Sequence, residues 1–238
     1  VRAGLFELPL IHSPGQRLDD LATYGYEGSH VGLDDLTLAQ PRLGLELEQH
    51  LGSTVVAGTL AIGEFKGAAY GGKPIDTGVN TRAAQPEFGL FVRTPIAPWV
   101  TLTGDALAGS RRIFPTGAAA FADGYRRDAL GIDLHPLSRV SLLAEQWWGS
   151  DADADGFGSR FGSSGGFVRM RYAVGAHAYI GTRDEAAAVP AVTRDVVIYA
   201  ATQLGRHARL LIENKHTLNG PTTLEGAVTV AVPWPRGL

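Results

Sequence analysis

The stretch Arg42-Leu43-Gly44-Leu45-Glu46-Leu47-Glu48 decides the fold class of this chain. Leucines occupy every second position, and the positions between them carry charged residues or glycine. Only an extended backbone separates these side chains into an apolar and a polar face, because successive residues of a β-strand point to opposite sides. The same alternation returns at 168–174, 209–215 and 224–230. We therefore predict an all-β fold.

Segments of this kind recur along the whole chain of 238 residues. We expect about twelve strands, each close to the length that crosses an outer membrane at a tilt. The expected strands span 1–10, 41–50, 54–64, 85–94, 98–109, 125–134, 138–149, 164–173, 174–183, 193–203, 207–216 and 223–234. The alternation is weakest in 193–203, so the sequence does not fix which face of that strand is which.

The connections between these strands alternate in length. Short turns are expected at 51–53, 95–97, 135–137 and 204–206 and near 173–175, and long connections at 11–40, 65–84, 110–124, 150–163, 184–192 and 217–222. This alternation is typical of bacterial outer-membrane barrels, which have tight periplasmic turns and longer extracellular loops. We therefore predict an antiparallel transmembrane β-barrel of about twelve strands. We expect it to form one domain over residues 1–238, with both termini on the periplasmic side.

The first long connection, 11–40, repeats Leu-Asp-Asp-Leu at 18–21 and 33–36. It either constricts the mouth of the barrel or lies on its surface. The glycine- and serine-rich segment 156–166 has the composition of a linker, but strands continue on both sides of it, so we expect a loop tip. The chain begins at Val1 without a leader sequence and is expected to be a mature form or a fragment.

The composition limits the function classes. The chain has 31 glycines and only 19% charged residues, which argues against a charge-rich helical protein. Its longest uncharged stretches are too short for a membrane helix. Because it has no cysteine, it cannot hold a disulfide, a cysteine-ligated metal, an iron–sulfur cluster or a covalently attached haem. We expect no cofactor. The net charge of −3, with both signs interspersed, gives no basic surface for nucleic acids.

A soluble β-sandwich or lipocalin-like barrel would also show alternating strands. Such a fold gives no reason for the alternation of short and long connections, and its core would contain more aromatic and branched residues. The aromatic residues near strand ends resemble the interfacial girdles of membrane barrels. These aromatic residues are Trp99, Tyr125, Trp147, Trp148 and Trp234. The sequence therefore favours the membrane barrel over the soluble alternatives.

In a membrane barrel, the charged positions of each strand face the interior, because charged side chains survive there and not against lipid. The predicted pore-lining residues are Arg42, Glu46, Glu48, Glu87, Arg93, Asp105, Arg127, Asp133, Arg139, Glu145, Arg169, Arg171, His177, Arg209, Glu213, Lys215 and Glu225. The two signs are nearly balanced. They either form a polar pathway for solutes or fill and rigidify a narrow barrel, and a barrel of about twelve strands is compatible with both.

The sequence contains one candidate metal site and no catalytic motif. Asp151, Asp153 and Asp155, followed by Gly156, match the opening of an EF-hand calcium loop. Position twelve of that loop should be glutamate and is Gly162 here, which favours a solvated acidic loop. The histidines lack metal-ligand spacing, and no G-x-S-x-G or other hydrolase motif is present. We therefore do not expect an enzyme.

The N-terminal residues resemble those of a known family. Arg2-Ala3-Gly4-Leu5-Phe6-Glu7-Leu8-Pro9-Leu10, followed by Ser13-Pro14-Gly15-Gln16-Arg17-Leu18, resembles a strand and loop of bacterial outer-membrane porin-like proteins. Leu38-Ala39-Gln40-Pro41-Arg42-Leu43-Gly44-Leu45-Glu46 is similar to their next strand. The family meant here comprises phosphate-selective-porin-like barrels and barrels associated with multihaem cytochromes. Such porins usually have more strands and commonly end in phenylalanine, whereas this chain ends Trp234-Pro235-Arg236-Gly237-Leu238.

These features give three functional expectations. The first is an outer-membrane channel of a Gram-negative bacterium that passes small solutes or ions through a mixed-charge lumen. The second, implied by the resemblance, is a structural sheath that holds a multihaem cytochrome across the outer membrane, with every haem belonging to the partner. The third is a soluble ligand-binding β-protein.

Overall fold

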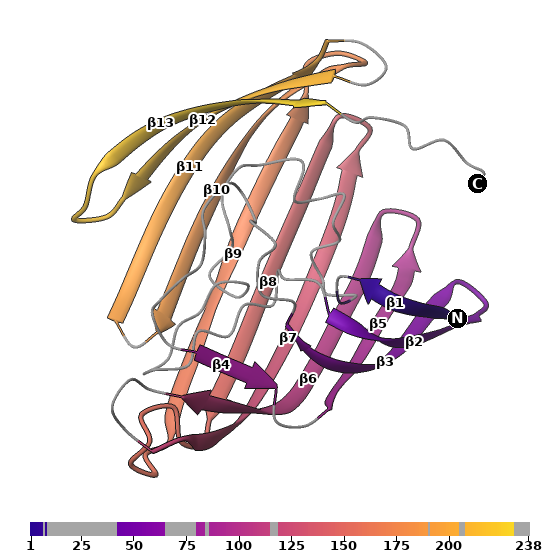
Figure 1. The fold of residues 1–238 in the computed structure, drawn as a ribbon. Coiled ribbons are helices and arrows are strands. Elements are labelled where there is room, and N and C mark those ends of the chain that lie inside the picture. Colours follow the sequence, from indigo (N-terminus) through magenta and orange to yellow (C-terminus); the bar gives the residue numbers. More distant parts are fainter. Residues whose placement is uncertain are drawn as a thin grey trace.

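The strands with alternating apolar and polar residues form one curved antiparallel sheet (Figure 1). The computed structural model describes residues 1–6, 8, 42–64, 80–83, 86–114, 119–189, 191–204 and 208–230. Its strands are β1 (Arg2–Phe6), β2 (Arg42–Leu51), β3 (Thr54–Glu64), β4 (Asn80–Ala83), β5 (Glu87–Ala97), β6 (Val100–Phe114), β7 (Phe121–Leu137), β8 (Val140–Asp151), β9 (Phe161–Ala173), β10 (Ala178–Val189), β11 (Ala191–Gln203), β12 (Ala208–Thr217) and β13 (Thr222–Val230).

The topology is a succession of hairpins. The path through the sheet is β1-β2-β3-β5-β6-β7-β8-β9-β10-β11-β12-β13, and the short β4 pairs with β6 outside it. This path confirms the predicted all-β, antiparallel architecture of about twelve strands. Within the described residues β1 and β13 are the two free edges, so the sheet is not closed into a ring.

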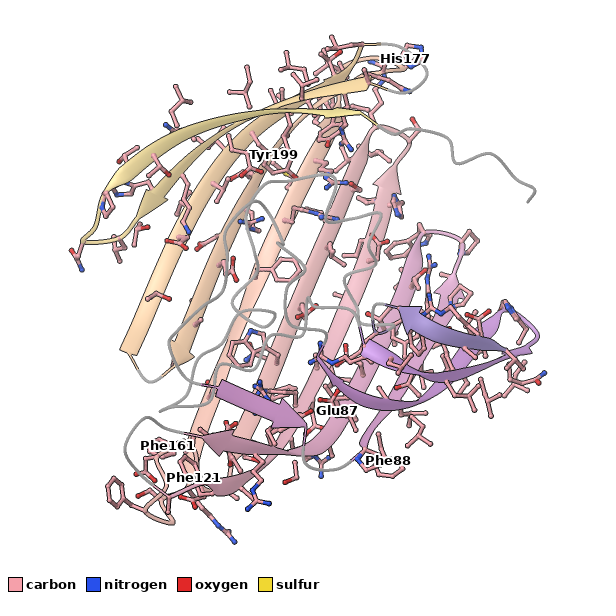
Figure 2. All side chains as sticks on the ribbon, in the orientation of Figure 1. Glu87, Phe88, Phe121, Phe161, His177 and Tyr199 are labelled. Carbon is pink, nitrogen blue, oxygen red and sulfur yellow. The ribbon has the colours of Figure 1, made fainter. Side chains whose placement is uncertain are left out.

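Successive hairpin connections lie alternately at one end of the strands and at the other (Figure 1). Each of these two rows of strand ends is called an edge from here on. One edge carries the links β2–β3, β5–β6, β7–β8, β9–β10 and β11–β12, and we call it the short-turn edge. The other edge carries the links β8–β9, β10–β11 and β12–β13, among others. In Figure 2, His177 lies at the short-turn edge, and Phe121 and Phe161 lie at the opposite edge.

Two of the expected long connections are wrong. The segment 110–124 belongs largely to β6 and β7, where Arg111 pairs with Asp123. The segment 184–192 belongs largely to β10 and β11, where Val189 pairs with Ala191. In these segments Arg111, Asp123 and Glu185 continue the period-two alternation on the face that also buries the other charges. The loop 11–40 lies outside the described residues.

The two faces of the sheet have inverted polarity. Glu87 is 1% exposed while its neighbour Phe88 is 62% exposed, and Figure 2 shows this pair on β5. The face that buries Glu87, here called the inward face, also buries Arg42, Glu46, Asp105, Arg111, Asp123, Arg127, Glu145, Asp151, Arg169, Arg183, Glu185 and Glu213. The opposite, outward face exposes Leu43, Leu45, Leu47, Leu60, Leu90, Leu130, Val168, Met170, Ile180, Val196, Ile198, Ile212 and Val228.

This distribution has a simple physical reading. A protein in water hides apolar side chains and leaves charges outside, because each apolar area removed from water is favourable and each buried charge needs a partner. Here a continuous apolar face is exposed, and such a surface marks contact with lipid or another apolar partner. Among the described residues, no helix is both long and apolar enough to cross a membrane.

The inward face is packed by pairing large side chains with glycine across neighbouring strands. Gly109 lies opposite Tyr125, Gly149 opposite Arg127, Gly165 opposite Trp147 and Gly181 opposite Tyr199. A Cβ atom on Gly109 would lie 2.7 Å from the Tyr125 hydroxyl, and one on Gly165 would lie 2.7 Å from Trp147 Cζ2. The high glycine content therefore has a packing role, since these positions leave room for interior side chains.

Candidate functional site

The first part of the candidate site is a layer of buried ion pairs on the inward face. Arg42 Nε donates to Glu87 Oε2 at 2.9 Å, and neither side chain is more than 1% exposed. Arg127 donates to Asp151 Oδ1 at 2.9 Å, again with both side chains buried. Because a buried charge is stable only when it is paired, these contacts fix the side chains of strands that are distant in sequence.

An apolar cluster lies between these charges. It contains Leu8, Ala61, Leu107, Tyr125, Ala129 and Trp147, all of them buried. The Arg127 guanidinium lies 5.9 Å from the centre of the Tyr125 ring. This part of the interior is therefore filled by side chains, as in small barrels whose wall residues meet in the middle.

The second part of the site is an arginine and tyrosine cluster on β9 to β12. Arg171 Nε donates to the Tyr199 hydroxyl at 3.0 Å and its guanidinium lies 5.0 Å from the Tyr179 ring centre. Arg209 donates to the Tyr179 hydroxyl and lies 5.1 Å from the same ring. The two tyrosine rings meet edge to face at 6.0 Å. Such contacts hold the guanidinium planes in fixed orientations.

Farther along the same strands, Lys215 Nζ lies 2.7 Å from Asp195 Oδ2, and this pair is partly exposed. Arg183 Nε lies 3.5 Å from Glu185 Oε2, with both side chains buried. The inward face of β9 to β12 therefore presents charges of both signs, like the region around β5 to β8.

The structure places most predicted pore-lining residues on the inward face. Those that are buried are Arg42, Glu46, Glu87, Asp105, Arg127, Glu145, Arg169 and Glu213. Asp133, Arg171, Arg209 and Lys215 are half-buried, and Glu48 and Arg93 are exposed near the short-turn edge. The side chain of Glu225 lies outside the described residues, although its backbone pairs with Glu213. The role of all these residues in lining a pore stays a prediction.

Arg139 and His177 do not occupy the strand positions expected for them. Arg139 lies in the turn between β7 and β8, and His177 lies in the turn between β9 and β10. Both are exposed. The expected strand 174–183 begins four residues late, at Ala178, because Val174 and Gly175 donate their backbone N–H groups to the Ala178 carbonyl and close the hairpin there.

Sequence reasoning missed several interior residues. Arg111, Asp123, Asp151 and Glu185 were assigned to loops, and Arg183 to no role, yet all five are buried on the inward face. Their signal was present, since each continues the odd-numbered positions of its strand. Two expected girdle residues are also wrong: Tyr125 and Trp147 point inward and are buried. Trp99 and Trp148 are exposed as a girdle requires, and Trp234 lies outside the described residues.

The candidate calcium loop does not assemble. Asp151 pairs with Arg127, Asp153 Oδ1 accepts from the Gly158 amide at 2.6 Å, and Asp155 Oδ1 accepts from the Phe157 amide at 2.9 Å. This last contact lowers the pKa of the Asp155 carboxyl. The carboxylates serve separate partners, and within the described residues no group of acidic or histidine side chains could hold a metal ion.

Comparisons with known proteins agree with this architecture. No protein-family model matches the chain, and no curated protein sequence matches it. Among solved structures, the outer membrane channel DcaP of Acinetobacter baumannii matches with a TM-score of 0.60 and 11% identity. The match covers 95% of this chain and 68% of that chain. At this identity the likeness concerns the fold alone, a sheet of antiparallel strands joined by successive hairpins.

Proposed function

We propose that this chain is a porin-like channel of a bacterial outer membrane that passively conducts small solutes or ions. The observation that carries the proposal is the inverted polarity of the sheet. Charged side chains are buried on the inward face and large apolar side chains are exposed on the outward face. Such a sheet is stable where lipid covers the outward face and water or protein meets the inward one. The fold likeness to an outer-membrane channel supports the same environment.

The inward charges would then bias passage. Rings of charged side chains attract ions of opposite sign and repel those of like sign. Arg169 and Arg171 lie on β9, and Arg183 lies directly opposite Arg169 on β10, which places three arginines close together on this wall. The role is non-enzymatic and needs no cofactor in this proposal. A finer relationship to phosphate-selective-porin-like barrels rests on the N-terminal resemblance.

The proposal is tested by ion selectivity. We expect the purified chain, refolded into lipid vesicles and fused with a planar bilayer, to conduct. Replacing Arg169 and Arg171 with glutamate should shift the reversal potential in a KCl gradient toward cations, because two positive charges become negative. The matched control is Arg126→Glu, since Arg126 lies on the outward face of β7, paired with Asp128. Absence of conductance in the parent chain would refute the channel.

The same recording separates the second candidate function. A barrel that sheaths a multihaem cytochrome would not conduct and would purify from its native membrane with haem absorbance. This second candidate is supported by the N-terminal resemblance to barrels associated with multihaem cytochromes. The buried pairs of Arg42 and Arg127 weigh against it, because they fill part of the interior that an enclosed protein would need. A conducting, haem-free barrel would exclude the sheath.

A further inference from the structure

The short-turn edge carries a pattern that does not recur on the inward face elsewhere among the described residues. β2 ends in Glu48-x-His50 and β7 ends in Asp133-x-His135, so each histidine follows a carboxylate by two residues. Residues two apart share one face of a strand, and both pairs therefore lie on the inward face. His50 Nε2 lies 2.9 Å from Glu48 Oε1, and His135 Nε2 lies 3.3 Å from Asp133 Oδ1.

A third histidine lies at the same edge. His177, in the turn between β9 and β10, accepts a hydrogen bond at its carbonyl from the Gln203 amide at 2.8 Å. Gln203 lies directly opposite Arg209 on β12, so His177 and Arg209 share one row across the sheet. Figure 2 shows His177 at the extremity of the sheet.

The charged neighbours of these histidines come from several strands. Around His50 they are Glu48 on the same strand and Arg93 on β5. His50 pairs with Val55 on β3, and Val55 pairs with Arg93, so the three residues lie side by side across the sheet. Around His135 they are Asp133 on the same strand and Arg139 in the following turn, with Arg169 in the row of Asp133. Around His177 they are Arg209 and, farther along β9, Arg171.

These groups differ from the deeper charges in their exposure to water. The side chains of His50 and Glu48 are 65% and 46% exposed, and those of His135 and Asp133 are 58% and 24% exposed. By contrast, the side chains of the ion pairs Arg42–Glu87 and Arg127–Asp151 are at most 1% exposed. The exposed groups at the short-turn edge are therefore the first charges that a solute meets from that side.

We propose that this edge is the charge filter of the channel and that its histidines make the filter respond to pH. The filter, here called the histidine rim, consists of Glu48, His50, Arg93, Asp133, His135, Arg171, His177 and Arg209. The inference rests on the proposed function and names the residues that set its selectivity. Its arginines outnumber its carboxylates, so the rim is positive at neutral pH. Protonation of any of the three histidines adds one positive charge to the rim.

The test compares ion selectivity at pH 7.5 and pH 5.5. The full chain is placed in planar bilayers under a KCl gradient, and the chloride-to-potassium permeability ratio is measured. We expect acidification to raise this ratio on the order of two- to threefold, because local positive charge concentrates anions. The triple variant His50→Gln, His135→Gln and His177→Gln should lose most of the increase. At positions 50 and 135 glutamine can still hydrogen-bond to the carboxylate, and at all three positions it cannot become charged.

The matched control is His216→Gln. His216 lies on β12 near the opposite edge of the sheet, where its Nδ1 contacts Thr222 Oγ1 at 2.8 Å. This variant should keep the full response to acid. An equal increase in the triple variant and the parent would overturn the histidine rim while leaving the channel intact. No current from any form would overturn the channel and the rim together. Heat-modifiable mobility in gel electrophoresis verifies that each variant is folded.

Discussion

The outward and inward faces of the sheet are built from alternate residues of the same strands, yet they follow opposite rules. On the outward face, large apolar side chains such as Leu130 and Ile198 are 60% and 62% exposed. On the inward face, charged side chains such as Arg42 and Glu87 are almost completely buried. Each face therefore suits a different environment: the outward face suits an apolar medium, and the inward face suits paired charges or water.

The largest loss of stability is expected when one partner of a buried ion pair on the inward face is removed. Replacing Glu87 with leucine removes the carboxylate that pairs with the buried Arg42 guanidinium. We expect the free energy of unfolding to fall by about 3–5 kcal/mol. Urea titration in lipid vesicles, followed by tryptophan fluorescence, measures the loss. The double variant Glu87→Leu with Arg42→Met should recover most of it, because both charges are gone. A loss of stability as large in the double variant as in the single one would contradict the pairing.

The outward face is tested by adding a charge to it. Leu130 lies within β7 and is 60% exposed, whereas Leu137 ends the same strand and is 67% exposed. We expect Leu130→Arg to destabilise the folded barrel by about 2–4 kcal/mol and Leu137→Arg by about 0–1 kcal/mol, because the penalty falls toward the membrane surface. The measurement is the same urea titration. Equal effects at the two positions would argue that no lipid covers this face.

The smallest expected effect concerns glycine on the two faces. Gly165→Ala would place a Cβ atom 2.6 Å from the Ala186 carbonyl oxygen and 2.7 Å from Trp147, whereas Gly58→Ala meets nothing within 4 Å. We expect the first change to destabilise by about 1–3 kcal/mol and the second to be nearly neutral. Trp147 emission should shift in the first variant alone. Indistinguishable stabilities would show that the interior around Trp147 is loosely packed.

Much of the fold could be predicted from the sequence, because strand alternation is a local property. The leucines of β2 identified both faces correctly, and the parity held through β12. Strand ends were harder, since charged residues such as Arg111 and Glu185 occur in loops as often as in a polar barrel wall. The tryptophan at 147 was misjudged because composition does not distinguish an interfacial ring from one packed against a facing glycine.

The candidate site was less predictable than the fold. The odd or even position of a residue in its strand predicts whether its side chain faces inward, but it does not predict which inward side chains are in contact. The contact between Arg171 and Tyr199 joins residues 28 apart, and that between Arg42 and Glu87 joins residues 45 apart. Both depend on strand register, which single-strand patterns leave undetermined. The predicted short turns at 51–53 and 135–137 already place His50 and His135 at the same edge, and the topology agrees. The contacts of these histidines with Glu48 and Asp133 come from the structure.

The glycines opposite large side chains bear on how the strands find their alignment. A slip of two residues between β8 and β9 would keep apolar side chains outside and charged ones inside, so polarity alone cannot forbid it. It would, however, replace Gly165 opposite Trp147 with Ser163 or Phe167, and neither leaves room for the indole. Similar steric pairs occur at Gly109, Gly149 and Gly181. The glycines thus select one strand register during assembly from several registers that all keep apolar side chains outward and charged side chains inward.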